Sequence, residues 1–155
     1  MKTSYKLVLL FLISGIFLPL FQPVPTIAAG ASLYLSPTAG TKYTGDKFNI
    51  FVYVSATQSV NTFDVYLSSS NITVTGVSSG GSICVLFPNP PSYTSSGARF
   101  KCGLPTPGFT GGKGYIGAIA VQAGSPGTGK ISIDSPSVVL ANDGAGTNVL
   151  GSKGT

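Results

Sequence analysis

The sequence predicts an all-β fold: an antiparallel jelly-roll β-sandwich of about nine strands after an N-terminal signal peptide. Short segments alternate apolar and polar residues with a period of two, as strands with one buried face do. Clusters of glycine, proline, asparagine, aspartate and serine separate these segments at regular intervals, and no window of a dozen residues has a helical apolar stripe. Short strands at this spacing are typical of sandwiches and jelly rolls.

Residues 1–31 have the pattern of a secretory signal. Two lysines lie in 1–6, and 7–21 is almost purely apolar. This run is shorter than the roughly 20 apolar residues that cross a bilayer. The small residues of 28–31 offer a cleavage site that ends at Ala31, and an earlier cut after Ala28 or Ala29 is the alternative. We expect removal of 1–31 and a single domain over 32–155, with an uncleaved membrane anchor as the other interpretation.

The clearest strands are predicted at 48–54 and 60–68. In the first, Phe48, Ile50, Val52 and Val54 share one face, opposite Asn49, Phe51 and Tyr53. In the second, Phe63, Val65 and Leu67 share the buried face, opposite Thr62, Asp64, Tyr66 and Ser68. Further strands are expected at 32–35, 72–77, 82–87, 98–103, 115–123, 130–133 and 138–140.

The segment 115–123 is apolar on both faces. This pattern favours a central strand that is covered on both sides. The alternative is that one face of its sheet is an exposed apolar docking surface.

Two long loops rich in proline and glycine are expected at 88–97 and 104–114. Each has one aromatic residue near its middle, Tyr93 in the first and Phe109 in the second. A protruding ring at either position can stack on a sugar or on a protein partner. Alternatively, each ring caps the open end of the sandwich.

Two cysteines remain after export, Cys84 and Cys102. An even cysteine count in an oxidising compartment favours a disulfide. It would close a loop of about 19 residues and stabilise the fold by about 3 kcal/mol in the chain-entropy model. Two buried free thiols are the alternative.

The composition argues against an enzyme, a metal protein or a nucleic-acid-binding protein. Only 8% of the residues are charged, histidine and glutamate are absent, and the four acids are widely spaced aspartates. Histidine-dependent triads and histidine-ligated zinc sites are therefore excluded. The basic residues are scattered singly rather than clustered as a nucleic-acid footprint would be. We expect no catalysis, no cofactor and no metal.

One outward face carries the candidate binding residues. Thr62, Asp64 and Tyr66 are spaced by two, opposite a buried row, so their side chains line one surface. A carboxylate between a hydroxyl and a tyrosine suits directional hydrogen bonding to a partner. The alternative is a merely solvated face.

In order and spacing the chain resembles the cohesin domain family. The resemblance rests on Leu35-Ser36-Pro37, on 43–48 leading into an alternating strand, on 60–67, and on 139–144 near the end. It implies a nine-stranded jelly roll, related in fold to carbohydrate-binding modules, that holds dockerin modules on a flat sheet face. It also implies that Thr62 and Asp64 occupy the two partner-binding positions of the family's third strand, where Thr62 replaces an asparagine.

Together these observations predict a secreted or cell-surface binding module that recruits a dockerin-like protein or binds polysaccharide, in extracellular polysaccharide degradation or surface attachment. It would contact a membrane only through an uncleaved signal segment. A structural subunit of a surface layer or filament is the main alternative. A direct carbohydrate-binding module that uses Tyr93 or Phe109 is the third.

Overall fold

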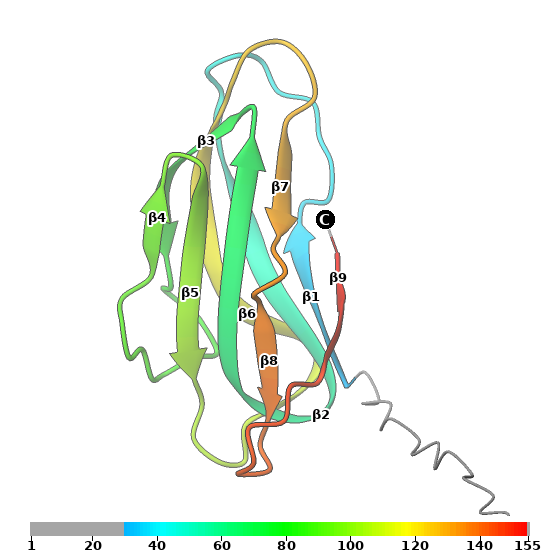
Figure 1. Ribbon diagram of the computed structural model, residues 1–155. Helices are drawn as coiled ribbons and strands as arrows, with labels where there is room; N and C mark the ends of the chain where they lie inside the picture. The colour runs from blue at the N-terminus through cyan, green and yellow to red at the C-terminus, as the bar shows by residue number, and fades with distance from the viewer. Residues whose placement is uncertain (1–29, 155) are drawn as a thin grey trace, which may run out of the picture.

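The computed structural model describes residues 30–154, which form nine β-strands and no α-helix (Figure 1). The strands are β1 (Ala31–Ser36), β2 (Lys47–Ser70), β3 (Ile72–Ser78), β4 (Ser92–Thr94), β5 (Gly97–Gly103), β6 (Phe109–Ala123), β7 (Lys130–Ile133), β8 (Val138–Ala141) and β9 (Leu150–Lys153). The predicted signal sequence lies outside the described residues, apart from Gly30 and Ala31. A helix with the length and apolarity to span a membrane is not found in the described part of the chain.

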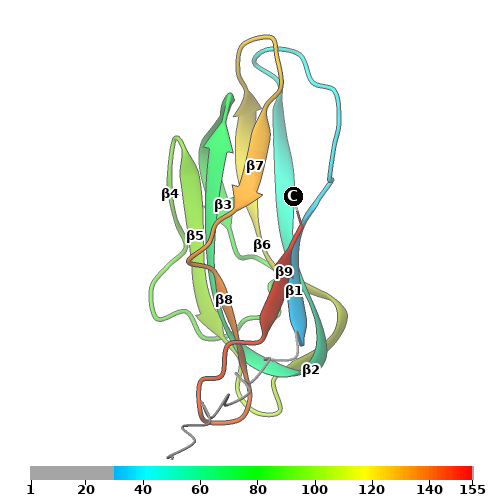
Figure 2. The same ribbon diagram turned by 45° about the vertical axis from the view of Figure 1, so that its right-hand side comes forward.

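The strands form two layers that share β2. The first half of β2 pairs with β1 and β6, and these strands with β3 and β9 form one layer, named here the β6 layer. The second half pairs with β5, β7 and β8, and these strands with β4 form the β5 layer. Figures 1 and 2 show β2 curving at the lower end of the sandwich from one layer into the other. The predicted all-β jelly-roll sandwich is confirmed.

The two strands predicted at 48–54 and 60–68 are one continuous strand. The intervening residues 55–59 contain no glycine or proline to end it, so the strand bends instead. Its register with β6 shifts three times, between Val52 and Val60. At the bend the backbone changes partners: Thr57 donates to the Gly30 carbonyl, and the Ser59 carbonyl accepts from Asn142.

The prediction of a strand at 82–87 is wrong, because this segment crosses between the two layers instead of running along one of them. The Ile83 amide donates to the Tyr115 carbonyl of the β6 layer, whereas Leu86 exchanges hydrogen bonds with Gly103 of the β5 layer. Because the hydrogen bonds of this segment to the two layers lie only three residues apart, the segment cannot form an extended strand in either layer.

Three further differences concern edges and loops. The loop predicted at 88–97 contains the short strand β4, which forms a tight hairpin with β5. The loop predicted at 104–114 is shorter, because β6 begins at Phe109. The strand β9 was not predicted, since Leu150–Lys153 is short and mostly exposed, and it pairs in parallel with β1 in an otherwise antiparallel fold.

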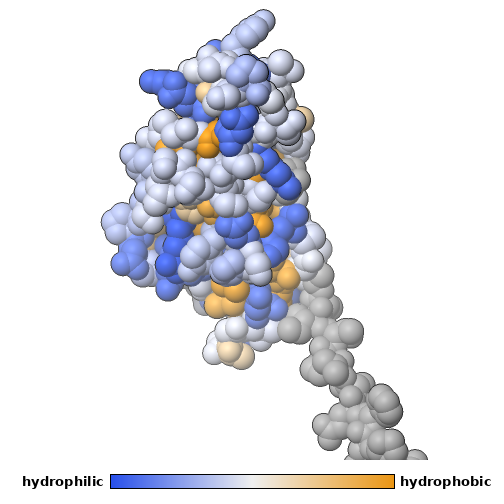
Figure 3. Space-filling view, turned by 45° about the horizontal axis from the view of Figure 1, so that its top comes forward, coloured by the Kyte–Doolittle hydropathy of each residue, from blue (hydrophilic) through white to orange (hydrophobic). Residues whose placement is uncertain are grey.

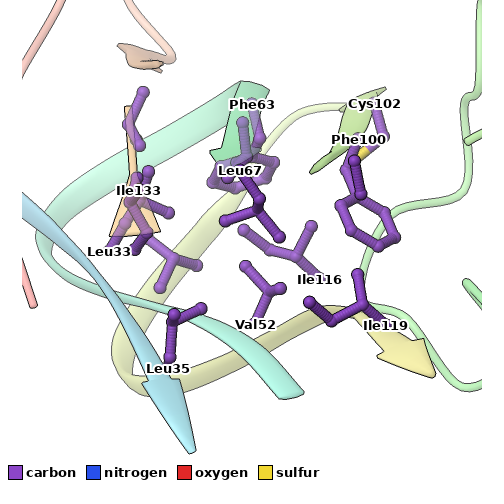
Figure 4. Close-up of a cluster of buried hydrophobic side chains, with 14 of the residues drawn as sticks. Leu33, Leu35, Val52, Phe63, Leu67, Phe100, Cys102, Ile116, Ile119 and Ile133 are labelled. Atoms are coloured by element: carbon purple, nitrogen blue, oxygen red, sulfur yellow. The ribbon is translucent and has the colours of Figure 1, made fainter. Parts of the chain in front are cut away.

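The hydrophobic core fills the space between the two layers (Figure 4). Phe63 and Phe100 from the β5 layer and Ile116 and Ile119 from the β6 layer are fully buried. The face of the molecule in Figure 3 is mostly neutral to hydrophilic, with small scattered hydrophobic patches. The buried row predicted along each half of β2 therefore faces this core.

The apolar segment 115–123 lies in β6, which is a central strand between β2 and β3. The prediction that it is covered on both sides is wrong for its outer side. Ile116, Ile119 and Val121 face the core, but in the described chain no second layer covers Tyr115 and Ala120, which remain half-buried.

A close approach between the layers requires glycine at position 117 of β6. A Cβ atom there would collide with the Phe100 ring and lie 2.8 Å from the Ser78 carbonyl oxygen. At Gly112 of the same strand, nothing lies within 4 Å of the equivalent Cβ position.

We therefore expect Gly117→Ala to lower the free energy of unfolding by about 1–3 kcal/mol through overpacking. Gly112→Ala is the matched control and is expected to stay within about 0.5 kcal/mol of the parent. Urea unfolding followed by circular dichroism measures both. Equal stability of the two variants would contradict the packing described here.

Candidate functional site

The outward face of the β5 layer carries the residues predicted to bind a partner. Alternation along the second half of β2 directs Thr62, Asp64 and Tyr66 away from the core, with the side chains of 63, 65 and 67 buried between them. The register sets Asp64 opposite Lys101 of β5 and Tyr66 opposite Arg99. Polar groups of two neighbouring strands therefore meet on one surface.

A bidentate ion pair lies at the centre of this face. The Arg99 guanidinium donates from Nε to Asp64 Oδ1 at 2.8 Å and from Nη2 to Asp64 Oδ2 at 2.7 Å. The Asp64 side chain is only 15% exposed, whereas that of Arg99 is 40% exposed. Asp64 therefore offers its remaining acceptor capacity from a fixed position, and Arg99 presents the more accessible charge.

Tyr66 supports the same pair. The Arg99 guanidinium carbon lies 4.4 Å from the centroid of the Tyr66 ring, within the range of a cation–π contact. The hydrogen bond to Asp64 raises the pKa of Arg99 further above its usual value. The Arg99 guanidinium therefore keeps its charge, and stacking on Tyr66 limits the rotamers of the arginine.

Local hydrogen bonds fix the polar side chains on either side. The Thr62 hydroxyl donates to Asn61 Oδ1 at 3.2 Å, and the Asn61 amide donates to Asn142 Oδ1 at 2.9 Å. At the other end, the Ser68 hydroxyl donates to Asp134 Oδ1 at 2.7 Å. The polar side chains of this face are thus held by contacts within the chain, in three separate groups around Thr62, Asp64 and Ser68.

Sequence reasoning missed Arg99 and Asp134 as parts of this face. In the sequence, Arg99 is one of the basic residues that are scattered singly. Its partner is 35 positions away, and only the β2–β5 register brings the two together. The only sequence signal is an arginine at an outward position of a predicted strand, which does not by itself identify a partner.

The two predicted loop aromatics occupy different environments. Tyr93 is 50% exposed on β4 and lines an open hollow together with Arg99 and Asp134. Phe109, at the start of β6, is half-buried and packs against the core. Of the two, only Tyr93 presents its ring beside the candidate face, and its role in binding stays a prediction.

The predicted disulfide between Cys84 and Cys102 is present, with Cα atoms 5.8 Å apart. Cys102 lies on β5 opposite Phe63, and both sulfur-bearing residues are buried. The bond ties the crossing segment 82–87 to β5. It lies behind the polar face, so it supports that face without contributing to its surface.

This face offers carboxylates, a guanidinium, hydroxyl groups and two tyrosine rings. Over residues 30–154, no three histidine, cysteine or acidic residues lie close enough together to hold a metal ion.

Comparison with solved structures shows that the chain has a cohesin-like fold. A cohesin in a type I cohesin–dockerin complex from Clostridium thermocellum is 17% identical, with a TM-score of 0.61 over 83% of this chain and 92% of that one. The sixth cohesin of scaffoldin B from Acetivibrio cellulolyticus, in complex with a mutant dockerin, is 13% identical, with a TM-score of 0.58 over 80% of this chain and 96% of that one.

A third similar structure is a non-cellulosomal cohesin from the hyperthermophilic archaeon Archaeoglobus fulgidus. It is 13% identical, with a TM-score of 0.56 over 80% of this chain and 86% of that one. No family model and no curated protein matches the sequence. The cohesin-like fold expected from the sequence is thus confirmed by structure at very low identity.

Removing both cysteines as Cys84→Ala with Cys102→Ala is expected to lower the free energy of unfolding by about 3 kcal/mol, because the reduced chain gains conformational entropy when unfolded. Urea unfolding of the parent with and without reductant is the internal control: the reduced parent should approach the double variant. A double variant as stable as the oxidised parent would contradict a stabilising bond.

Proposed function

We propose that the chain is an exported, non-catalytic binding module of cohesin type that recruits a dockerin-like protein through the outward face of the β5 layer. The observation that carries the proposal is the fixed Asp64–Arg99 pair, flanked by Tyr66 and Thr62, at the centre of that face. Solved structures of the same fold are described as cohesins in complex with dockerins, which supports a protein partner here.

The physical features of the face suit a protein partner. Its polar groups span both strands of the β2–β5 pair, and Val138 and Leu140 of β8 stand opposite Asp64 and Thr62 on the same side. Charged groups surrounded by aliphatic and aromatic surface match the anatomy of protein interfaces, in which arginine and tyrosine are enriched. A link to extracellular polysaccharide degradation rests on the cohesin resemblance.

The disulfide supports export, since such bonds persist in oxidising compartments. We place the signal cleavage after Ala28 or Ala29 rather than after Ala31. Gly30 and Ala31 both donate to the Val149 carbonyl, and Ala31 is buried opposite Ala56 of β2. A cut after Ala31 would remove these interactions from the start of β1.

Asp64→Ala is expected to weaken dockerin binding at least tenfold, because it removes the central acceptor and leaves Arg99 without its partner. Isothermal titration calorimetry against a panel of dockerin modules measures the affinity. Lys47→Ala, on the opposite layer, is the control and should change it less than twofold. The proposal fails if no dockerin in the panel binds the parent, or if Asp64→Ala binds as tightly as the parent does.

The N-terminus of the secreted protein is expected at Ala29 or Gly30, because Gly30 and Ala31 both donate to the Val149 carbonyl at the start of β1. Intact-mass spectrometry of protein recovered from the culture medium determines it. Mature protein that begins at Ser32 would refute this assignment, and protein that keeps residues 1–28 would favour the anchored alternative.

A further inference from the structure

A second surface, on the opposite side of the sandwich, has a different chemistry. Three tyrosines stand directly opposite one another on neighbouring strands of the β6 layer: Tyr34 on β1, Tyr53 on β2 and Tyr115 on β6. The rings of Tyr34 and Tyr53 are stacked with centroids 5.4 Å apart, and those of Tyr53 and Tyr115 are 5.6 Å apart. Their outward direction follows from the alternation along each strand.

Phe51 extends this aromatic row along β2. Its ring lies 6.2 Å from that of Tyr115, and the residue is 37% exposed. Beside these two rings lies a hollow in the surface. Ala118 and Ala120 of β6 line this hollow, and their small side chains leave it open. Asn49 lines the same hollow and provides amide hydrogen-bonding groups.

The charge of this face is of one sign. Lys113 lies with its Nζ 5.2 Å from the Tyr53 ring centroid, and Lys47 shares the outward side of β2 with Asn49 and Phe51. No outward residue of β1, β3, β6 or the first half of β2 is acidic. Asp46 lies in the turn directly before Lys47, where its carboxylate accepts from the Tyr43 amide, and Asp64, Asp134 and Asp143 belong to the β5 layer and the ends of its strands.

A second copy of the chain does not suit this face. Phe51 is its only large hydrophobic side chain more than one-third exposed among the described residues. Stable protein–protein interfaces bury roughly 1,200–2,000 Å² around a well-packed apolar centre. Two facing copies would also bring lysines of the same sign together, which opposes association.

We propose that this aromatic face binds an acidic polysaccharide, one that carries uronate groups along its chain. The exposed ring of Phe51 and the solvent-facing parts of the tyrosine rings provide apolar surface against which the C–H faces of sugars can pack. Asn49 and the hydroxyls of Tyr53 and Tyr115 provide hydrogen bonds, whereas the Tyr34 hydroxyl already donates to the Gly112 carbonyl. Lys47 and Lys113 complement the carboxylates. This site is separate from the β5-layer face, so its existence does not depend on dockerin binding.

Isothermal titration calorimetry of the purified protein with polygalacturonate tests the proposal, with alginate as a second acidic glycan and hydroxyethylcellulose as the neutral one. Binding to an acidic glycan is expected to weaken at least tenfold in Phe51→Ala. Lys113→Ala is expected to weaken binding to the acidic glycan several-fold and to reduce the salt dependence of that binding. Thermal unfolding of each variant confirms folding, and Tyr53→Phe, which keeps the ring, should retain most of the affinity.

Matched controls on other surfaces make the result specific. Tyr43→Ala removes an aromatic ring that is 83% exposed in the loop before β2, and Lys101→Ala removes the same charge from the β5 layer. Both variants should bind the acidic glycan as tightly as the parent does, and so should Tyr93→Ala. The proposal is overturned if neither acidic glycan binds, if the neutral glycan binds equally well, or if Lys101→Ala matches the effect of Lys113→Ala. A dimer that dissociates in Phe51→Ala would assign the face to a second copy.

Discussion

Continuity of strand β2 across both layers is the constraint on which the rest of the structure depends. Lys47–Ser70 supplies a central strand to each layer, and every other strand except β3, β4 and β9 pairs with it directly. Because the backbone changes hydrogen-bonding partners at 55–59 without ending, the two halves are held in a fixed relation. The buried rows 50–54 and 63–67 then face each other across one core.

This arrangement places two chemically different surfaces back to back. On the β5 layer, alternation turns Asp64 and Tyr66 outward beside Arg99, giving a compact polar face with one strong ion pair. On the β6 layer, the same alternation turns Phe51 and Tyr53 outward, giving an aromatic face with lysines. The face proposed to bind a dockerin-like protein and the face proposed to bind an acidic glycan therefore lie on opposite sides of the sandwich.

The sequence was sufficient for features that depend on local periodicity. The inward and outward sides of both halves of β2, and hence the shared face of Thr62, Asp64 and Tyr66, follow from a period of two. The Cys84–Cys102 pairing could be predicted because the chain has only two cysteines. Features set by strand register were not accessible, because register depends on contacts between distant segments. The Asp64–Arg99 pair, the tyrosine row across three strands and the parallel β9 all belong to this class.

Native-state hydrogen exchange along β2 tests the central claim most directly. If one strand unites both layers, the slowest amides of 50–54 and of 63–67 should exchange only through global unfolding, with the same opening free energy. Free energies that differ by more than about 1 kcal/mol between the two halves would contradict the account, because the layers would then open as separate units.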